Sequence, residues 1–181
     1  MAVLRITKYP EKILSAKCRK VDAWSEELTQ LVSDMFETMY AVSGVGLAAN
    51  QIGLDLRLAV IDTGPQGQSQ RLLLLNPKIL EASGAQSDSE GCLSLPGIFK
   101  PVEHAASVRV LTYNEKGIPF EIRGEGLLAR ALQHEIDHLN GKVFIERLPL
   151  MQRLRVKKEL QGYQNLWSHQ ASLRPGVGAG A

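Results

Sequence analysis

The sequence predicts an α+β fold, in which mixed or antiparallel strands pack around a central helix. An amphipathic helix precedes the strands and a further helix follows them. Two observations support this class. Apolar residues recur at helical spacing near both ends of the chain and once in its second half. Between these segments, short apolar runs alternate with Gly, Pro and Asn turn residues, a pattern typical of strands.

The composition indicates a single globular domain. The 181 residues include 44% hydrophobic and 22% charged residues, with a net charge of +2. Such a chain forms one domain with a substantial core, and its charge favours no specific nucleic-acid partner. We expect a single domain over residues 1–163 and a flexible tail over 164–181, where no apolar period is present.

Segments that would direct the chain to a membrane are not expected. The opening MAVLRITKYP lacks an apolar region followed by a cleavage site, and the run LLLLNP (72–77) is too short to span a bilayer. A cytoplasmic location is therefore the expectation. The two cysteines, Cys18 and Cys92, are too few for a disulfide framework, so each needs a separate explanation.

The first helix begins after Ser25. Acidic residues follow in its first turn, apolar residues recur at helical spacing through Tyr40, and Gly44 lies beyond its end. Residues 56–62 and 71–77 are short apolar runs separated by a Gly/Pro/Gln loop, which predicts two strands.

A hairpin and two more helices follow. Apolar residues on both sides of NEKG, within residues 106–124, predict the hairpin, with Pro119 leaving its second strand partly unpaired. After Gly126, the segment LLARALQHEIDHL is apolar on two faces, so this helix belongs in the interior. The last helix, within residues 148–163, has Pro149 in its first turn and Gly162 near its end.

The interior helix carries the pattern H-E-x-x-H. His134 and His138 are four residues apart, so both imidazoles project from one face and can bind one ion. Two incidental histidines would give the same pattern, and a third ligand is needed to decide. Glu146, Glu159 and His169 lie downstream, but two are in ordinary charged surroundings and the third is in the expected tail.

Upstream, SEGCLSLPG places Cys92 in a loop or strand-end setting, where a thiolate could face a metal. A lone cysteine is also a common small core residue, and the residues alone leave both interpretations open.

Three segments resemble the signature motifs of the peptide deformylases, in the order found in that family: GVGLAANQIG (44–53), EGCLSLPG (90–97) and QHEIDHLNG (133–141). The resemblance extends from YPEKIL near the start to GKVFIERL at 141–148. It implies that Cys92, His134 and His138 bind a metal, with water as the fourth ligand. The interior helix would then be a central metal-binding helix. By the same resemblance Fe(II) is the working ion, and Zn, Ni or Co can occupy the site.

The chemistry of these ligands agrees with the resemblance. Three protein ligands leave an open position, as in catalytic rather than structural sites, and an ion held there lowers the pKa of bound water to about 7. Glu135 is expected to exchange protons with that water and with the leaving amine. By resemblance, the Gln51 side-chain amide and the Leu93 backbone N–H stabilise the oxyanion.

The expected substrate is the N-formylmethionyl end of a nascent peptide, from which formate is released. Gly46 allows close approach of a peptide that pairs in β-fashion, and Val45, Leu127 and Ala131 form a pocket for the first side chain. Two alternatives remain at this point. One is a related small metallohydrolase that acts on another N-acyl group or peptide, and the other is a metal-stabilised binding module without catalysis.

Some positions depart from the common family pattern. Phe99, Lys100 and His104 lie in a segment where arginines are frequent, and Asp88 replaces a residue that is commonly apolar beside the pocket. Preference for particular peptide sequences is therefore not transferred from the family. Lys100 would supply a charge without the planar fork of arginine.

The last helix carries a basic flank made of Arg153, Arg155, Lys157 and Lys158. A solvated helix surface is the simpler interpretation. A transient association with ribosomes, whose surface is rich in phosphate, is the alternative.

Overall fold

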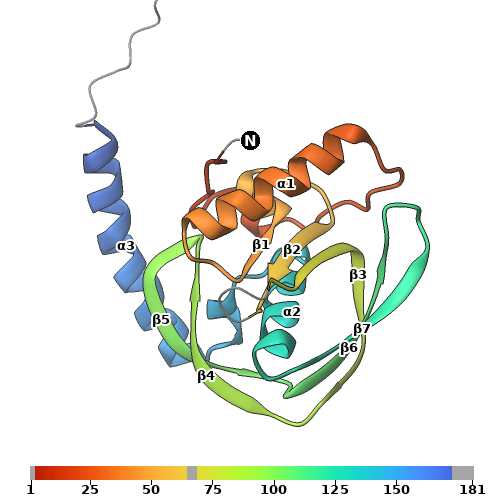
Figure 1. Ribbon diagram of the computed structural model, residues 1–181. Coiled ribbons are helices and arrows are strands. Elements are labelled where there is room, and N and C mark those ends of the chain that lie inside the picture. Colours follow the sequence, from red (N-terminus) through yellow and green to blue (C-terminus); the bar gives the residue numbers. More distant parts are fainter. Residues whose placement is uncertain (1–2, 65–68, 173–181) are drawn as a thin grey trace, which may run out of the picture. The chain divides into compact units, whose positions relative to one another are not determined.

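The computed structural model describes residues 3–64 and 69–172, with side chains described up to residue 162 (Figure 1). The chain divides into two compact units, Met1–Arg147 and Leu148–Ala181, which are described separately. In the first unit the elements follow in the order η1 (Lys12–Ser15), α1 (Glu26–Ala41), β1 (Gly46–Ala48), η2 (Ala49–Ile52), β2 (Leu58–Asp62), β3 (Arg71–Ser83), β4 (Gln86–Cys92), β5 (Leu95–His104), β6 (Ser107–Tyr113), β7 (Pro119–Glu125), α2 (Gly126–Leu139) and η3 (Phe144–Arg147).

Five strands form an antiparallel sheet in the order β1-β2-β3-β6-β7. Both predicted strands in its middle are confirmed, and β3 continues beyond Pro77 to Ser83. All five residues of β2 are buried, because alternate side chains face opposite sides of the sheet and both sides are covered. The predicted hairpin is also confirmed, since β6 and β7 pair. The expectation that Pro119 leaves the second strand partly unpaired is wrong: β7 is paired with β6 along its whole length, with Pro119 opposite Tyr113. Because β7 is an edge strand and Pro119 is its first residue, the missing N–H costs little.

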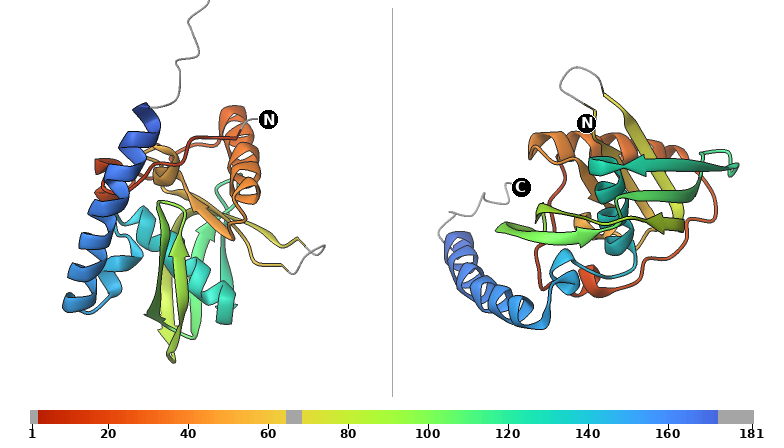
Figure 2. Two further views of the ribbon diagram at one scale, coloured as in Figure 1. Left: turned by 90° about the vertical axis from the view of Figure 1, so that its left-hand side faces the viewer. Right: turned by 90° about the horizontal axis from the view of Figure 1, so that it is seen from below.

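Helix α2 lies inside the first unit. It contacts strands of the five-stranded sheet on one side and β5 on another, and two views in Figure 2 show it enclosed by strands. Its apolar side packs against alternate residues of the sheet in one core cluster, which includes Ile61, Leu74, Val110, Leu132 and Ile136. The α+β class with antiparallel strands around a central helix is thus confirmed.

Helix α1 covers the other face of the sheet. Ser25 caps it as predicted, since its Oγ accepts a hydrogen bond from the backbone N–H of Leu28 at 3.4 Å. Apolar residues of α1 join Leu58 and Val60 of β2 in a second core cluster. The helix end differs in detail from the prediction: Ser43, not Gly44, takes the left-handed conformation (φ 54°), and the Gly44 N–H bonds Met39 O.

Strands β4 and β5 form a separate two-stranded sheet. Their pairing shifts register between Gly91 and Cys92, where the strands meet at a tight turn. Cys92 is the last residue of β4, which agrees with its predicted setting at a strand end. The β-pairing of residues 86–91 with 99–104 was not predicted from the sequence.

The second unit contains α3 (Leu150–Ser172), which confirms a helix at this end of the chain. It runs past Gly162, where the sequence predicted its end. Glycine inside a helix costs only about 1 kcal/mol relative to alanine, so flanking helix-forming residues can continue the helix. The predicted domain boundary at residue 163 and the tail over 164–181 stay predictions, and residues 173–181 lie outside the described residues. Among the described residues, no helix is long and apolar enough to cross a membrane.

Candidate metal centre and active site

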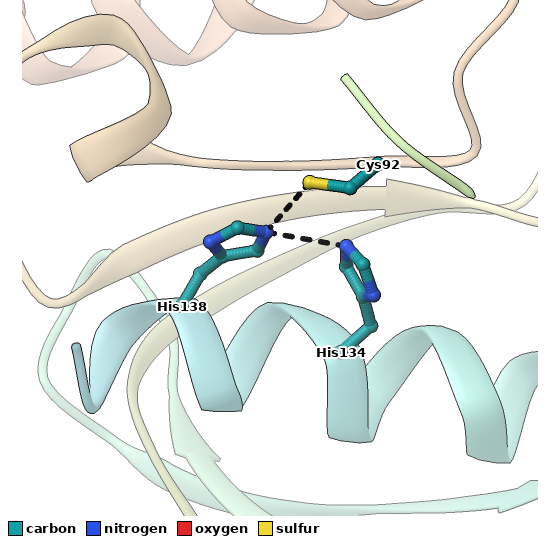
Figure 3. Close-up of side chains that lie close together, drawn as sticks. All are labelled: Cys92, His134 and His138. Carbon is teal, nitrogen blue, oxygen red and sulfur yellow. Dashed lines mark hydrogen bonds between the residues drawn. The ribbon is translucent and has the colours of Figure 1, made fainter. Parts of the chain in front are cut away.

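Cys92, His134 and His138 come together at the buried side of α2 (Figure 3). The two histidines project from successive turns of the helix, and their Nε2 atoms are 3.2 Å apart. Cys92 Sγ, from the end of β4, lies 3.2 Å from His138 Nε2. The predicted grouping of these three side chains is present in the structure.

The positions of the three donor atoms suit a single divalent ion. All three lie within 4.8 Å of one another. Donors around one tetrahedral ion, with metal–nitrogen bonds near 2.0 Å and a metal–sulfur bond near 2.3 Å, are separated by roughly 3.3–3.7 Å. The cluster therefore needs only small adjustments to hold an ion. A thiolate with two imidazoles also suits Zn(II), Fe(II), Co(II) and Ni(II).

Glu90 fixes the orientation of His134. Its Oε1 lies 2.6 Å from His134 Nδ1, and its Oε2 lies 2.6 Å from Nε2 of the buried His104. Burial acts to raise the pKa of Glu90, but hydrogen bonds from His104 and His134 outweigh it and hold the pKa at about 2. Because an ionised carboxylate only accepts hydrogen bonds, His134 Nδ1 carries the proton and Nε2 offers its lone pair to the cluster.

Glu135 is the neighbouring carboxylate on α2. It is buried, and its Oε2 has no hydrogen-bond partner among the described residues. Burial raises the pKa of Glu135 to about 7, while the charge of His134 acts against this increase and that of Glu90 adds to it. A carboxylate with this pKa can both accept and release a proton near neutral pH.

Gln51 and Leu93 lie on the other side of the cluster. Gln51 Oε1 accepts a hydrogen bond from the Ala48 N–H at 2.9 Å, which turns Nε2 toward Ser94 Oγ at 3.3 Å and Cys92 Sγ at 3.5 Å. The carbonyl of Leu93 accepts a hydrogen bond from Lys8 Nζ at 2.7 Å. The nitrogen of the same peptide group, which belongs to Ser94, lies 3.4 Å from Cys92 Sγ.

These residues border a cavity of about 480 Å³. All the predicted site residues except His138 line it, including Val45, Gly46, Leu127 and Ala131. Val45 and Leu127 are each 43% exposed, so they lie where the cavity opens to solvent. Gly46 belongs to β1, which is an edge strand of the five-stranded sheet, and a Cβ at this position would lie 2.2 Å from Glu135 Oε1.

Several residues of the site were not predicted from the sequence. Glu90 contacts His134, Lys8 donates to the Leu93 carbonyl, and Arg130 lines the cavity and forms an ion pair with Asp88 at 2.7 Å. His104, noted only as a departure from the family pattern, supports Glu90. The period-two spacing of Asp88, Glu90 and Cys92 could have placed all three on one side of a strand, if that strand had been recognised.

The α+β fold and the cluster define a class. Three donors suited to a divalent ion, two of which line a cavity at an open sheet edge, lie beside a carboxylate with a raised pKa, which is the arrangement of metal-dependent hydrolases. Sequence comparison makes the family specific: residues 3–154 match the profile of the polypeptide deformylases. This chain belongs to the polypeptide deformylase family.

Individual relatives agree with this assignment. The chain is 45% identical to a peptide deformylase of Elusimicrobium minutum over 176 residues, covering 93% of this chain and 100% of the relative. It is 50% identical to a peptide deformylase of Clostridium botulinum, over 81% of this chain and 97% of the relative. A crystal structure of a peptide deformylase from Legionella pneumophila superposes with a TM-score of 0.84, at 41% identity, covering 96% and 100% of the two chains. The family resemblance predicted from three motifs is confirmed.

Proposed function

We propose that this enzyme performs the reaction of its family, removal of the N-formyl group from nascent peptides, at the cluster of Cys92, His134 and His138. The observation that carries the proposal is the convergence of these three donors beside Glu135, in a cavity that opens at the edge strand β1. Hydrolysis adds water to the formyl carbon, breaks the carbon–nitrogen bond, and yields formate and a free amine.

The three side chains would hold one divalent ion, and Fe(II) is the proposed ion on the family resemblance, with Zn, Ni or Co as substitutes. A bound ion would polarise the formyl carbonyl and lower the pKa of water at the site. The protein's part is to keep the donors in place. The Glu90 carboxylate orients His134, and the Ser94 N–H and Gln51 Nε2 both point at Cys92 Sγ.

Glu135 is the proposed proton carrier. Its carboxylate takes a proton from the attacking water and returns it to the amine nitrogen as the carbon–nitrogen bond breaks. Its burial and its unpartnered Oε2 support this role, because no described residue competes for that oxygen. A divalent ion held by the three donors would lower the pKa of Glu135 from about 7 and favour the ionised form that accepts the proton.

Gln51 and Leu93 are the proposed oxyanion donors. The hydrogen bond from the Ala48 N–H holds the Gln51 side chain so that its amide nitrogen faces the cluster. Leu93 follows Cys92 directly and lines the same cavity, which supports the proposal that its backbone N–H donates to the reacting carbonyl. Donors fixed before the reaction stabilise developing negative charge without reorganisation.

The peptide would bind along β1. This strand pairs with β2 on one side only, so its other edge can accept a substrate strand, with Gly46 allowing close approach. Val45, Leu127 and Ala131 then border the first side chain, which is methionine in the proposed substrate. Methionine is unbranched and flexible and fits apolar pockets of irregular shape.

Formate release from formyl-Met-Ala-Ser by the metal-loaded enzyme tests the proposal, with acetyl-Met-Ala-Ser as the matched substrate. We expect release of formate and little release of acetate. Faster release of acetate would instead support a hydrolase for another N-acyl group. A metal-loaded protein that releases neither would contradict catalysis.

In the cell, we propose that the enzyme works in the cytoplasm, where nascent chains emerge from ribosomes. The residues Arg153, Arg155, Lys157 and Lys158 of α3 would support a transient association, because positive charge attracts the phosphate-rich ribosome surface.

A further inference from the structure

Three pairs of side chains connect β4 with α2. Asp88, Glu90 and Cys92 alternate along the strand, and Arg130, His134 and His138 recur every four residues along the helix. Their partners match in order. Asp88 pairs with Arg130 at 2.7 Å, Glu90 with His134 at 2.6 Å, and Cys92 Sγ lies 3.2 Å from His138 Nε2. The last two pairs belong to the metal cluster and its support, and the first pair has no role in the proposed reaction.

Arg130 of the first pair lines the cavity that contains the pocket proposed for the first side chain of the substrate. Leu127, Arg130, Ala131 and His134 share one face of α2, and all four line the cavity. The Arg130 side chain is only 19% exposed, whereas that of Asp88 is 58% exposed. The Arg130 side chain is therefore mostly buried where it lines the pocket, and the more exposed Asp88 carboxylate holds its Nη1.

Arginine gives this pocket hydrogen-bond donors that apolar neighbours cannot supply. A guanidinium carries five N–H donors in a rigid plane and keeps its charge at all working pH values. Asp88 is the one ion-pair partner that the described residues give it. An ion pair with one partner this exposed contributes little to folding stability.

We propose that Arg130, anchored by Asp88, allows the enzyme to accept peptides that begin with N-formylmethionine sulfoxide. This inference rests on the proposed function. The thioether of methionine is a weak hydrogen-bond acceptor, but oxidation converts it into a polar sulfoxide whose oxygen accepts strongly. In an apolar pocket that oxygen would lose its hydrogen bonds to water without replacement. The N–H donors of Arg130 that Asp88 does not use would replace those hydrogen bonds.

The test compares kcat/KM for formyl-Met-Ala-Ser, its norleucine analogue and both sulfoxide epimers, in wild type and in Arg130→Met. Norleucine has the length of methionine without a polar atom, so the ratio of sulfoxide to norleucine reports the polar contact and not the pocket size. In wild type we expect at least one epimer within about tenfold of norleucine. In Arg130→Met the ratio should fall about tenfold or more, because a hydrogen bond to a charged donor is lost.

Arg123→Met, on the exposed side of β7, is the matched control and should keep the wild-type ratio. Arg130→Lys keeps a charge but not the planar donors, and should give an intermediate ratio even if Arg130→Met folds poorly. Equal ratios in wild type and Arg130→Lys, or wild-type ratios below about one tenth for both epimers, would overturn the inference. Absence of formate from formyl-Met-Ala-Ser would instead overturn the proposed function, and this inference with it.

Discussion

The carboxylate of Glu135 lies against the backbone of Gly46, so that a Cβ at Gly46 would be 2.2 Å from Oε1 and 2.8 Å from Cδ. Gly46→Ala must therefore displace the Glu135 side chain, while none of the three nearest atoms belongs to the metal cluster. We expect kcat to fall by about a hundredfold or more, the range for loss of a positioned general base, with normal metal content. Steady-state kinetics and metal analysis check this, and an unchanged kcat would show that the carboxylate can act from another position.

Cys92→Ala should lose the metal and with it the activity, since two imidazoles on one helix make a weak site. Cys18→Ala is the matched control. Cys18 is buried in the core, and burial raises the pKa of its thiol to about 11, so it is a packing residue and not a ligand. Metal per protein after gel filtration distinguishes the two variants. Full metal content in Cys92→Ala would refute the assignment of this ligand.

Glu90→Gln should weaken metal binding by about 10–100-fold, the usual effect of removing a residue that orients a ligating histidine. The amide cannot serve as an ionised acceptor for both His134 and His104. Competition with a chelator of known affinity measures the change. Glu103→Gln, at an exposed position of the neighbouring strand, should bind metal like wild type. Equal affinities in all three proteins would mean that His134 is oriented without Glu90.

Asp62 should stabilise the fold in a pH-dependent way. Burial acts to raise the pKa of Asp62, but hydrogen bonds from Ser69, Tyr40 and the N–H groups of Gln70 and Gly64 hold it well below the usual range. A lowered folded-state pKa contributes stability that is present above the unfolded value of 3.8 and lost as the pH falls below it. The difference in Tm between wild type and Asp62→Asn should thus be largest near neutral pH and narrow below 3.8. A difference that is constant down to pH 2 would contradict this.

Reversal of charge at Lys157 and Lys158 to Glu should weaken co-sedimentation with ribosomes at low salt, because the attraction is electrostatic. Turnover of short formyl peptides should not change, since neither residue lines the described cavity. The matched double variant Lys17→Glu/Lys116→Glu, at two exposed positions outside α3, controls for net charge. Unchanged co-sedimentation would leave only the solvated-surface interpretation of this helix.

Local features of the chain predicted most of the fold. The Ser25 cap, the apolar period of α1 and the turn residues at NEKG all act within a few residues, and each gave the observed element. The H-E-x-x-H spacing placed two donors on one helix face, and the family resemblance supplied Cys92, 42 positions before His134. Lys8, Glu90 and Arg130 were missed because their partners lie far away in sequence, as with Lys8 and Leu93. Only folding brings such residues together, and their own neighbours carry no signal of it.

The matched pairs between β4 and α2 reflect two nearly equal repeat lengths, that of two strand residues and that of four helix residues. Two residues of a strand advance by about 6.7 Å, and four residues of a helix by about 6.0 Å. Each further pair is therefore offset by roughly 0.7 Å from the one before it. Side chains of the strand and the helix therefore stay opposite one another over a few pairs, and beyond that span they no longer meet. Backbone geometry thus limits how many side chains can meet here, and inserting one residue into β4 before Asp88 would be tolerated far better than inserting one between Asp88 and Cys92.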